Sequence, residues 1–244
     1  MSIIREIPQE TCSKRSNSGF TLTELAIVLV IVSLLIGGML IPLGAQIDYR
    51  DVADTEKSLS EVKEALIGFA VVNRRFPRPA VSALNGAERA ACAITADCTG
   101  RIPWETLGIR KLDAWNKIIR YSVTPVFAGG ATGTDFITLA STPTKNVRTR
   151  ESSGVADAPL ATGVPVIVFS HGKRSHGEDN TGNAFPDSAA NNADEDANNA
   201  GPTTYYSRLI SADTTAPGGE FDDIVTWISS NVLFNRMISA GRLP

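Results

Sequence analysis

The sequence has 244 residues, with 23 basic and 26 acidic side chains and a formal net charge of −3 at pH 7. A nucleic-acid-binding domain carries a basic surface, so this balance excludes an obvious nucleic-acid partner. The acidic residues are concentrated late in the chain, because residues 170–223 hold ten Asp and Glu against three Lys and Arg. The length allows one ordinary globular domain and an additional element.

Near the N-terminus, an uncharged and mostly apolar run extends from Leu25 to Ile47. About 20 such residues cross a bilayer as a helix. Lys14 and Arg15 precede the run and several acidic residues follow it, which predicts a cytoplasmic N-terminus and an external C-terminal part. A plain signal anchor and a secretory signal cleaved before Gln46 are the alternatives, although a cleavable signal usually has a shorter apolar region.

The polar residues before this run carry the most specific signal. A carboxylate at the start of a membrane span, here Glu24, is costly and suggests a function. The string GFTLTELAIVLVIVSLLIGGMLIP, which begins at Gly19, resembles the prepilin signature of type IV pilins and type II secretion pseudopilins. In that family a dedicated prepilin peptidase cuts after the glycine and methylates the new N-terminal amine.

Carried over by position, the resemblance makes residues 1–19 the leader, with cleavage after Gly19, and Phe20 the N-methylated mature N-terminus. It makes residues 20–47 both the transmembrane helix and the filament-core helix, and Glu24 the assembly acid. A carboxylate and an ammonium that are both poorly hydrated attract strongly, so Glu24 could satisfy the Phe20 amine of a neighbouring subunit. The implied partners are other pilin or pseudopilin subunits, the prepilin peptidase, the inner membrane and an assembly platform.

The rest of the chain, residues 48–244, is predicted to form a periplasmic or extracellular domain of the α+β class. The helix is expected to continue to about residue 73, with an apolar stripe at helical spacing formed by Leu59, Val62, Leu66, Phe69 and Ala70. Short runs rich in β-branched and aromatic residues predict strands at 118–123, 136–141, 164–170 and 224–228. A short helix is predicted at 232–240. One long helix packed on an antiparallel sheet also matches the pilin fold.

Two further segments of this domain attract attention. Residues 188–201 are rich in Ala, Asn and acidic residues with nothing to bury, which predicts a mobile surface insertion. Cys92 and Cys98 follow the apolar run and are therefore expected in an oxidising compartment, where they could form a disulfide. Two unpaired thiols are the alternative, whereas a metal site lacks a complete set of ligands.

The C-terminal half resembles the major pseudopilin of type II secretion in two places. Residues 113–121 resemble the Asp-Pro-Trp-Gly-Asn…Tyr strand entry of that protein, and residues 168–172 with 221–227 resemble its Phe-Ser-x-Gly…Asp-Asp-Ile-x-x-Trp end. In that family the second motif surrounds a structural calcium ion, so Asp222 and Asp223 are candidate ligands, together with nearby backbone oxygens. The sequence departs from the family because Lys173 and Arg174 replace an acidic turn and about 50 residues separate the two halves. A solvated acidic loop without an ion is therefore the alternative. No other cofactor is expected.

An enzyme is the rival from a different class. Its candidate catalytic residues are Ser170, His171 and His176, together with the acidic residues downstream. However, the serine lacks the Gly-x-Ser-x-Gly turn, and two histidines cannot form a three-His metal site. We therefore predict a non-enzymatic filament subunit of a type IV pilus or a type II secretion pseudopilus, first in the inner membrane and then in the filament. A minor or tip subunit that binds an external ligand is the alternative.

Overall fold

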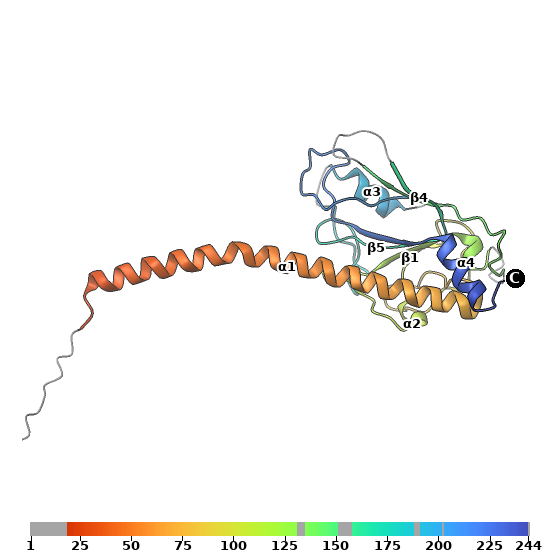
Figure 1. Ribbon diagram of the computed structural model, residues 1–244, viewed down its shortest axis with the longest axis horizontal. Coiled ribbons are helices and arrows are strands. Elements are labelled where there is room, and N and C mark those ends of the chain that lie inside the picture. The colour runs from red at the N-terminus through yellow and green to blue at the C-terminus, as the bar shows by residue number, and fades with distance from the viewer. Residues whose placement is uncertain (1–18, 131–134, 151–157, 188–190, 202, 244) are drawn as a thin grey trace, which may run out of the picture. The chain divides into compact units, whose positions relative to one another are not determined.

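The computed structural model describes residues 19–130, 135–150, 158–187, 191–201 and 203–243, and within these ranges the side chains of residues 38–43 are not described (Figure 1). The leader expected over residues 1–19 therefore lies outside the described residues, except for Gly19. The chain divides into two compact units, Met1–Ile47 and Asp48–Pro244.

Helix α1 spans Leu22–Asn73, so it begins in the first unit and ends in the second. In the first unit its large apolar side chains between Leu22 and Ile36 are exposed, with exposed fractions of 42% to 87%. Across the described part of the chain, no helix combines the length and the apolar character that a membrane crossing requires. The transmembrane span expected over 20–47 is thus not confirmed.

In the second unit α1 lies along a sheet and buries the expected stripe. Leu59, Val62, Leu66 and Ala70 are at most 1% exposed, whereas Phe69 is only half-buried. Spacing of three and four residues places these side chains on one face, where they join the main core cluster. The helix ends at Asn73, before Arg74 turns the chain with a φ of 57°.

The main sheet has four antiparallel strands in the order β1-β2-β5-β7. Their bounds are β1 Thr99–Arg101, β2 Arg120–Val123, β5 Val166–Ser170 and β7 Ile224–Ile228. Strand β5 is buried along its whole length, and its last residue, Ser170, is opposite Ile224 at the start of β7. The α+β class with a helix on an antiparallel sheet is confirmed, as is the strand predicted at 224–228.

A second sheet has the order β4-β3-β6, with β3 at Lys145–Thr149, β4 at Ala158–Val164 and β6 at Thr204–Tyr206. Strand β3 pairs antiparallel with β4 and parallel with β6. The strand predicted at 164–170 is therefore two elements, since β4 ends at Val164 and β5 begins at Val166. The two strands belong to different sheets, with Pro165 between them.

The strand predicted at 136–141 is wrong. Residues 135–140 form no strand, and Ser141 donates its backbone N–H to the Thr138 carbonyl oxygen at 3.0 Å. The Ser141 hydroxyl accepts from the Thr138 N–H in return. Only Ile137 of the apolar residues in this run is fully buried, so the run anchors a turn instead of pairing in a sheet.

The expectation that the insertion has nothing to bury is also wrong for residues 191–201. Helix α3 spans Ala193–Ala200 and buries Asp194, Glu195 and Asn198, all three with an exposed fraction of 0%. Buried polar groups are stable when they are hydrogen-bonded, and these three are. The remaining short elements are α2 at Trp104–Leu107, a 3-10 turn at Pro125–Ala128 and α4 at Ser230–Ser239, which confirms the C-terminal helix.

Candidate functional site

The N-terminal end of α1 carries the first candidate site. The Thr21 hydroxyl accepts from the Glu24 N–H at 3.2 Å, and the Glu24 carboxylate accepts from the Thr21 N–H at 3.3 Å. This reciprocal pair is a capping box, in which Glu24 and Thr21 each satisfy one N–H group at the start of the helix. Glu24 is exposed and follows Phe20 by four residues, and Phe20 is 85% exposed.

Gly19 has no structural requirement to be glycine within the described residues. A Cβ atom at this position would meet nothing within 4 Å, and Gly19 is not among the residues with a positive φ. The fold of the described chain therefore leaves the residue type at this position open.

The second candidate site lies where the loop after β5 meets the loop before β7. Glu195, Asp222 and Asp223 are buried there, with carboxylate oxygens that all lie within 4.8 Å of one another. The antiparallel register of β5 and β7 brings Asp222 and Asp223 next to the turn that follows Ser170. Glu195 comes from α3. We call these three residues the acidic cluster.

Asp222 joins the two loops. Its Oδ2 atom accepts from the backbone N–H groups of Lys173 at 3.1 Å and Arg174 at 2.9 Å. A Cβ atom on Gly172 would lie 2.3 Å from the Asp222 carbonyl oxygen and 2.7 Å from Oδ1, so this turn requires glycine, which also has a φ of 59°. The Oδ1 atom of Asp222 is buried and makes no hydrogen bond within the described structure.

Both carboxylate oxygens of Asp223 and both of Glu195 have a hydrogen-bonding partner. The Asp223 Oδ1 atom lies 3.2 Å from His171 Nδ1, and its Oδ2 accepts from Asn198 at 2.7 Å. Glu195 accepts from the Asp222 N–H at 2.6 Å and from Asn192 at 3.2 Å. Burial raises the pKa of Asp223 to about 8. Burial, followed by the charges of Asp223 and Asp222, also raises the pKa of Glu195 to about 8.

The cationic groups nearby do not balance these acids. Lys117 is buried, and its Nζ atom donates to three carbonyl oxygens in the turn after β5, at distances of 3.0 to 3.5 Å. Burial lowers its pKa, against the attraction of the cluster and of Asp113. Arg174 lies 3.9 Å from Asp222, and it also pairs with Glu220 at 3.6 Å. One ammonium and one shared guanidinium face the three carboxyl groups of the acidic cluster, so the pKa values of Glu195 and Asp223 stay raised.

This arrangement fits a hard divalent cation. Calcium takes six to eight oxygen ligands, and the acidic cluster offers three carboxylates in one buried space. Two buried side-chain oxygens, Asp222 Oδ1 and Asn192 Oδ1, have no hydrogen-bond partner in the described structure. An unsatisfied buried oxygen costs free energy, and a cation would satisfy it.

The candidate enzyme residues make contacts in and around the turn after β5. The Ser170 hydroxyl is fully buried and donates to Asp113 at 2.5 Å. Burial holds the pKa of His171 well below its ordinary value, so its ring is neutral. His176 instead pairs with Asp196 at 3.0 Å, in a separate and mostly exposed group that includes Asp187. The structure thus uses these residues to hold the turn after β5.

Cys92 and Cys98 are joined in a disulfide with a Cα–Cα distance of 5.0 Å. Both are at most 1% exposed and belong to the main core cluster. The bridge closes a short loop that ends directly before β1, an edge strand of the main sheet.

Residues 14–40 match the family model described as the prokaryotic N-terminal methylation motif. The chain carries the signature of type IV pilins and pseudopilins. No curated protein and no solved structure matches the chain. The pilin-type signature covers Gly19, Phe20 and Glu24, and it indicates a structural protein rather than an enzyme. The similarity of residues 113–121, and of residues 168–172 with 221–227, to the major pseudopilin stays a prediction.

The pilin-type signature and the acidic cluster differ in how visible they are in the sequence. The sequence points to Asp222 and Asp223 because residues 221–227 resemble the end motif of the major pseudopilin. Glu195, Asn198 and Lys117 were missed, because they lie far from that pair in the sequence and no local pattern connects them. The sequence does contain one signal for a helix here, because an Ala- and Asn-rich segment that includes Glu195 is followed by Gly201, a typical C-terminal cap.

Proposed function

We propose that the chain is a prepilin, which is processed after Gly19 and then assembles through its N-terminal helix into a type IV pilus-like or type II secretion filament. The inner membrane holds the subunit before assembly, and the C-terminal domain, residues 48–244, lies outside. The methylation motif at residues 14–40 supports this proposal.

The observation that carries the proposal is the exposed apolar surface of α1 in the first unit. Its large apolar side chains between Leu22 and Ile36 are exposed around the helix, not along one face. A helix that is apolar all round is stable only when lipid or other proteins surround it. A bundle of identical helices provides such an environment, and so does the membrane in which the subunit waits.

Phe20 and Glu24 give the bundle its register. Cleavage after Gly19 creates an ammonium on Phe20, and Glu24 of a neighbouring subunit lies at the same end of its own helix. When these two groups leave water together, each reduces the cost of burying the other. Before assembly the capping box with Thr21 holds the Glu24 carboxylate, at distances of 3.3 Å that are long for charge-assisted bonds.

Processing is tested by co-expressing the full chain with a prepilin peptidase and measuring the intact mass. We expect a product that begins at Phe20 and carries one additional methyl group, and Gly19→Val should leave the uncut precursor. Gly44→Ala is the matched control, because Gly44 also has open space around its Cβ position and should be processed normally. A product that begins at Gln46 would show ordinary signal cleavage and end the proposal.

The major-subunit role and the minor or tip role differ in abundance. Sheared filaments should contain this chain as their main component if it is a major subunit, and only in trace amounts if it is a minor subunit that binds an external ligand. Finding it in filaments that depend on a type II secretion platform, and not on a pilus platform, would identify the pseudopilus.

We also propose that Asp222 and Asp223 hold a structural calcium ion. The three buried carboxyl groups of the acidic cluster and the unsatisfied Asp222 Oδ1 atom support this. Binding to the folded state alone stabilises by about 2.7 kcal/mol at a hundredfold excess over Kd, which raises Tm by about 5 to 10 °C. The test is thermal unfolding of the full chain in detergent, with calcium and with a chelator. Equal Tm values in the two conditions would rule the ion out.

A further inference from the structure

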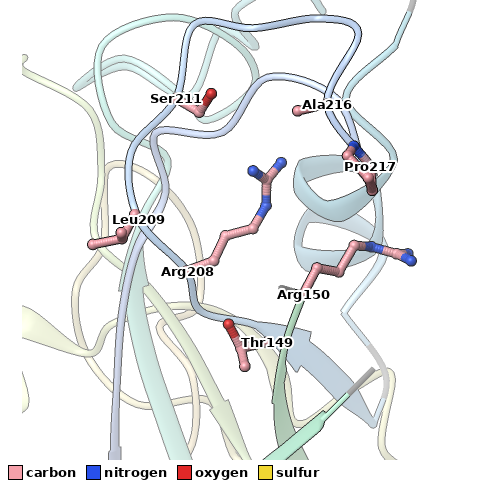
Figure 2. A pocket seen from close by; sticks show the side chains of 7 residues that line it. All are labelled: Thr149, Arg150, Arg208, Leu209, Ser211, Ala216 and Pro217. Carbon is pink, nitrogen blue, oxygen red and sulfur yellow. The ribbon is translucent and has the colours of Figure 1, made fainter. Parts of the chain in front are cut away.

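The segment between β5 and β7 contains a helix that reaches the acidic cluster from outside the main sheet. On one side of α3, Asp194 accepts from Arg150 at 2.7 Å and from Arg208 at 2.9 Å. Figure 2 shows Arg150 just after β3, and Arg208 pointing into a pocket. This pocket has a volume of about 480 Å³ and is also lined by Ser211 and Ala216. These contacts connect α3 to the second sheet.

The next residue of α3, Glu195, is directed at the main sheet. Glu195 has an exposed fraction of 0%, and its carboxylate holds the Asp222 backbone N–H at 2.6 Å. Asn198, one turn later, donates to Asp223 at 2.7 Å and accepts from the Tyr206 N–H at 2.6 Å. Helical spacing of three residues places Glu195 and Asn198 on one face, directed at Asp222 and Asp223.

The loop after β5 does not itself provide a third acid. The residues that follow Gly172 are Lys173 and Arg174, and they contribute backbone N–H groups to Asp222. The third carboxylate within 4.8 Å therefore comes from the insertion. The Asn192 side-chain amide donates to the Glu195 carboxylate at 3.2 Å, and Asn192 is 1% exposed. The Oδ1 atom of Asn192 has no hydrogen-bond partner among the described residues.

We propose that Glu195 is a ligand of a divalent cation bound by Asp222 and Asp223, and that this ion couples the folding of α3 to the main sheet. The inference rests on the proposed calcium site, and it adds that the insertion completes that site. Asn192 Oδ1 is positioned to serve as a neutral ligand beside Glu195. Release of the ion would remove the bound group that joins Glu195 to Asp222 and Asp223, and α3 would open more often from the start of β7.

The test uses the full chain in detergent micelles, with calcium chloride as the probe. Isothermal titration gives the calcium affinity, and hydrogen exchange gives the protection of residues 193–200 relative to 224–228. The wild type should bind one calcium ion. The protection of α3 should rise about a hundredfold at a hundredfold excess over Kd, because the ion binds only the closed form.

The decisive variants are Glu195→Gln and Asp196→Asn. Glu195→Gln should lower the calcium affinity about a hundredfold or more and abolish the gain in protection. Asp196→Asn changes a carboxylate on the same helix whose side chain is 55% exposed, and it should retain wild-type affinity. Loss of binding in Asp196→Asn, with normal binding in Glu195→Gln, would place the ion at His176 and overturn the inference.

The other outcomes separate the inference from the proposals on which it rests. A wild type that binds no calcium overturns both the site and the coupling, while the processing and assembly test is unaffected. Equal affinities of the wild type and Glu195→Gln would retain the ion at Asp222 and Asp223 but reject Glu195 as a ligand. If calcium does not change the hydrogen-exchange protection of α3 in the wild type, the coupling is overturned. This outcome needs no variant, so it does not depend on whether the variants fold.

Discussion

Asp194 offers a direct measure of how firmly α3 is held. Its carboxylate is fully buried between two guanidinium groups, with side-chain exposed fractions of 28% for Arg150 and 8% for Arg208. Asp194→Ala removes both ion pairs and leaves two cations close together. Breaking a buried pair by removing one partner costs about 3 to 5 kcal/mol, and the partial exposure of Arg150 favours the lower value. We therefore expect a loss of about 3 kcal/mol.

Urea denaturation of the full chain in detergent, in the presence of a chelator, measures this loss without a contribution from bound calcium. For a domain of this size, about 3 kcal/mol corresponds to a Tm lower by about 6 to 12 °C. Asp196→Ala is the matched control on the same helix, and it should change the free energy of unfolding by less than about 0.5 kcal/mol. If Asp194→Ala changes it as little as the control, α3 is not part of the cooperative fold, and the reasoning from burial is wrong.

Three further predictions concern separate parts of the chain. Glu24→Ala should be inserted and cleaved but incorporate poorly into filaments, which sheared-filament yields would show; wild-type yields would reduce Glu24 to its cap on α1. Replacing Cys92 and Cys98 by Ser should lower the free energy of unfolding by about 2 kcal/mol, since the closed loop is short, and a urea midpoint equal to that of the wild type would contradict this. Burial lowers the pKa of Lys145 to about 8, so the unfolded state binds more protons between pH 8 and its ordinary value of 10.5. Stability relative to Lys145→Met should therefore rise by about 2 kcal/mol across that interval, and a constant difference between the two proteins would refute it.

The parts of the fold that followed local patterns were predictable. The stripe from Leu59 to Ala70 repeats every three or four residues, and β7 is a run of β-branched and aromatic residues with acids before it. Both signals reside in adjacent residues, so no tertiary information was needed. The error at residues 136–141 has the opposite origin, because the same residue types close a turn when only Ile137 reaches the core.

The acidic cluster shows where local reading stops. Polar composition alone suggested that residues 188–201 had nothing to bury, yet Asp194 and Glu195 are among the least exposed residues of the domain. Their burial depends on partners that come from other elements, such as Arg208 and the Asp222 N–H. A polar residue becomes a core residue only when such partners are in place, and no single segment contains that information.

The position of α3 between β5 and β7 also bears on the order in which the domain folds. These two strands pair directly, although about 50 residues separate them in the chain. The entropic cost of closing a loop grows only with the logarithm of its length. Closing this connection therefore costs about 1.4 kcal/mol more than closing one that is a fifth as long. Contacts between residues so far apart form slowly. Strand β7, which completes the main sheet, can therefore pair with β5 only after the long connection between them has folded. A newly synthesised chain would pass through a stage in which one edge of β5 is open to strands from other chains.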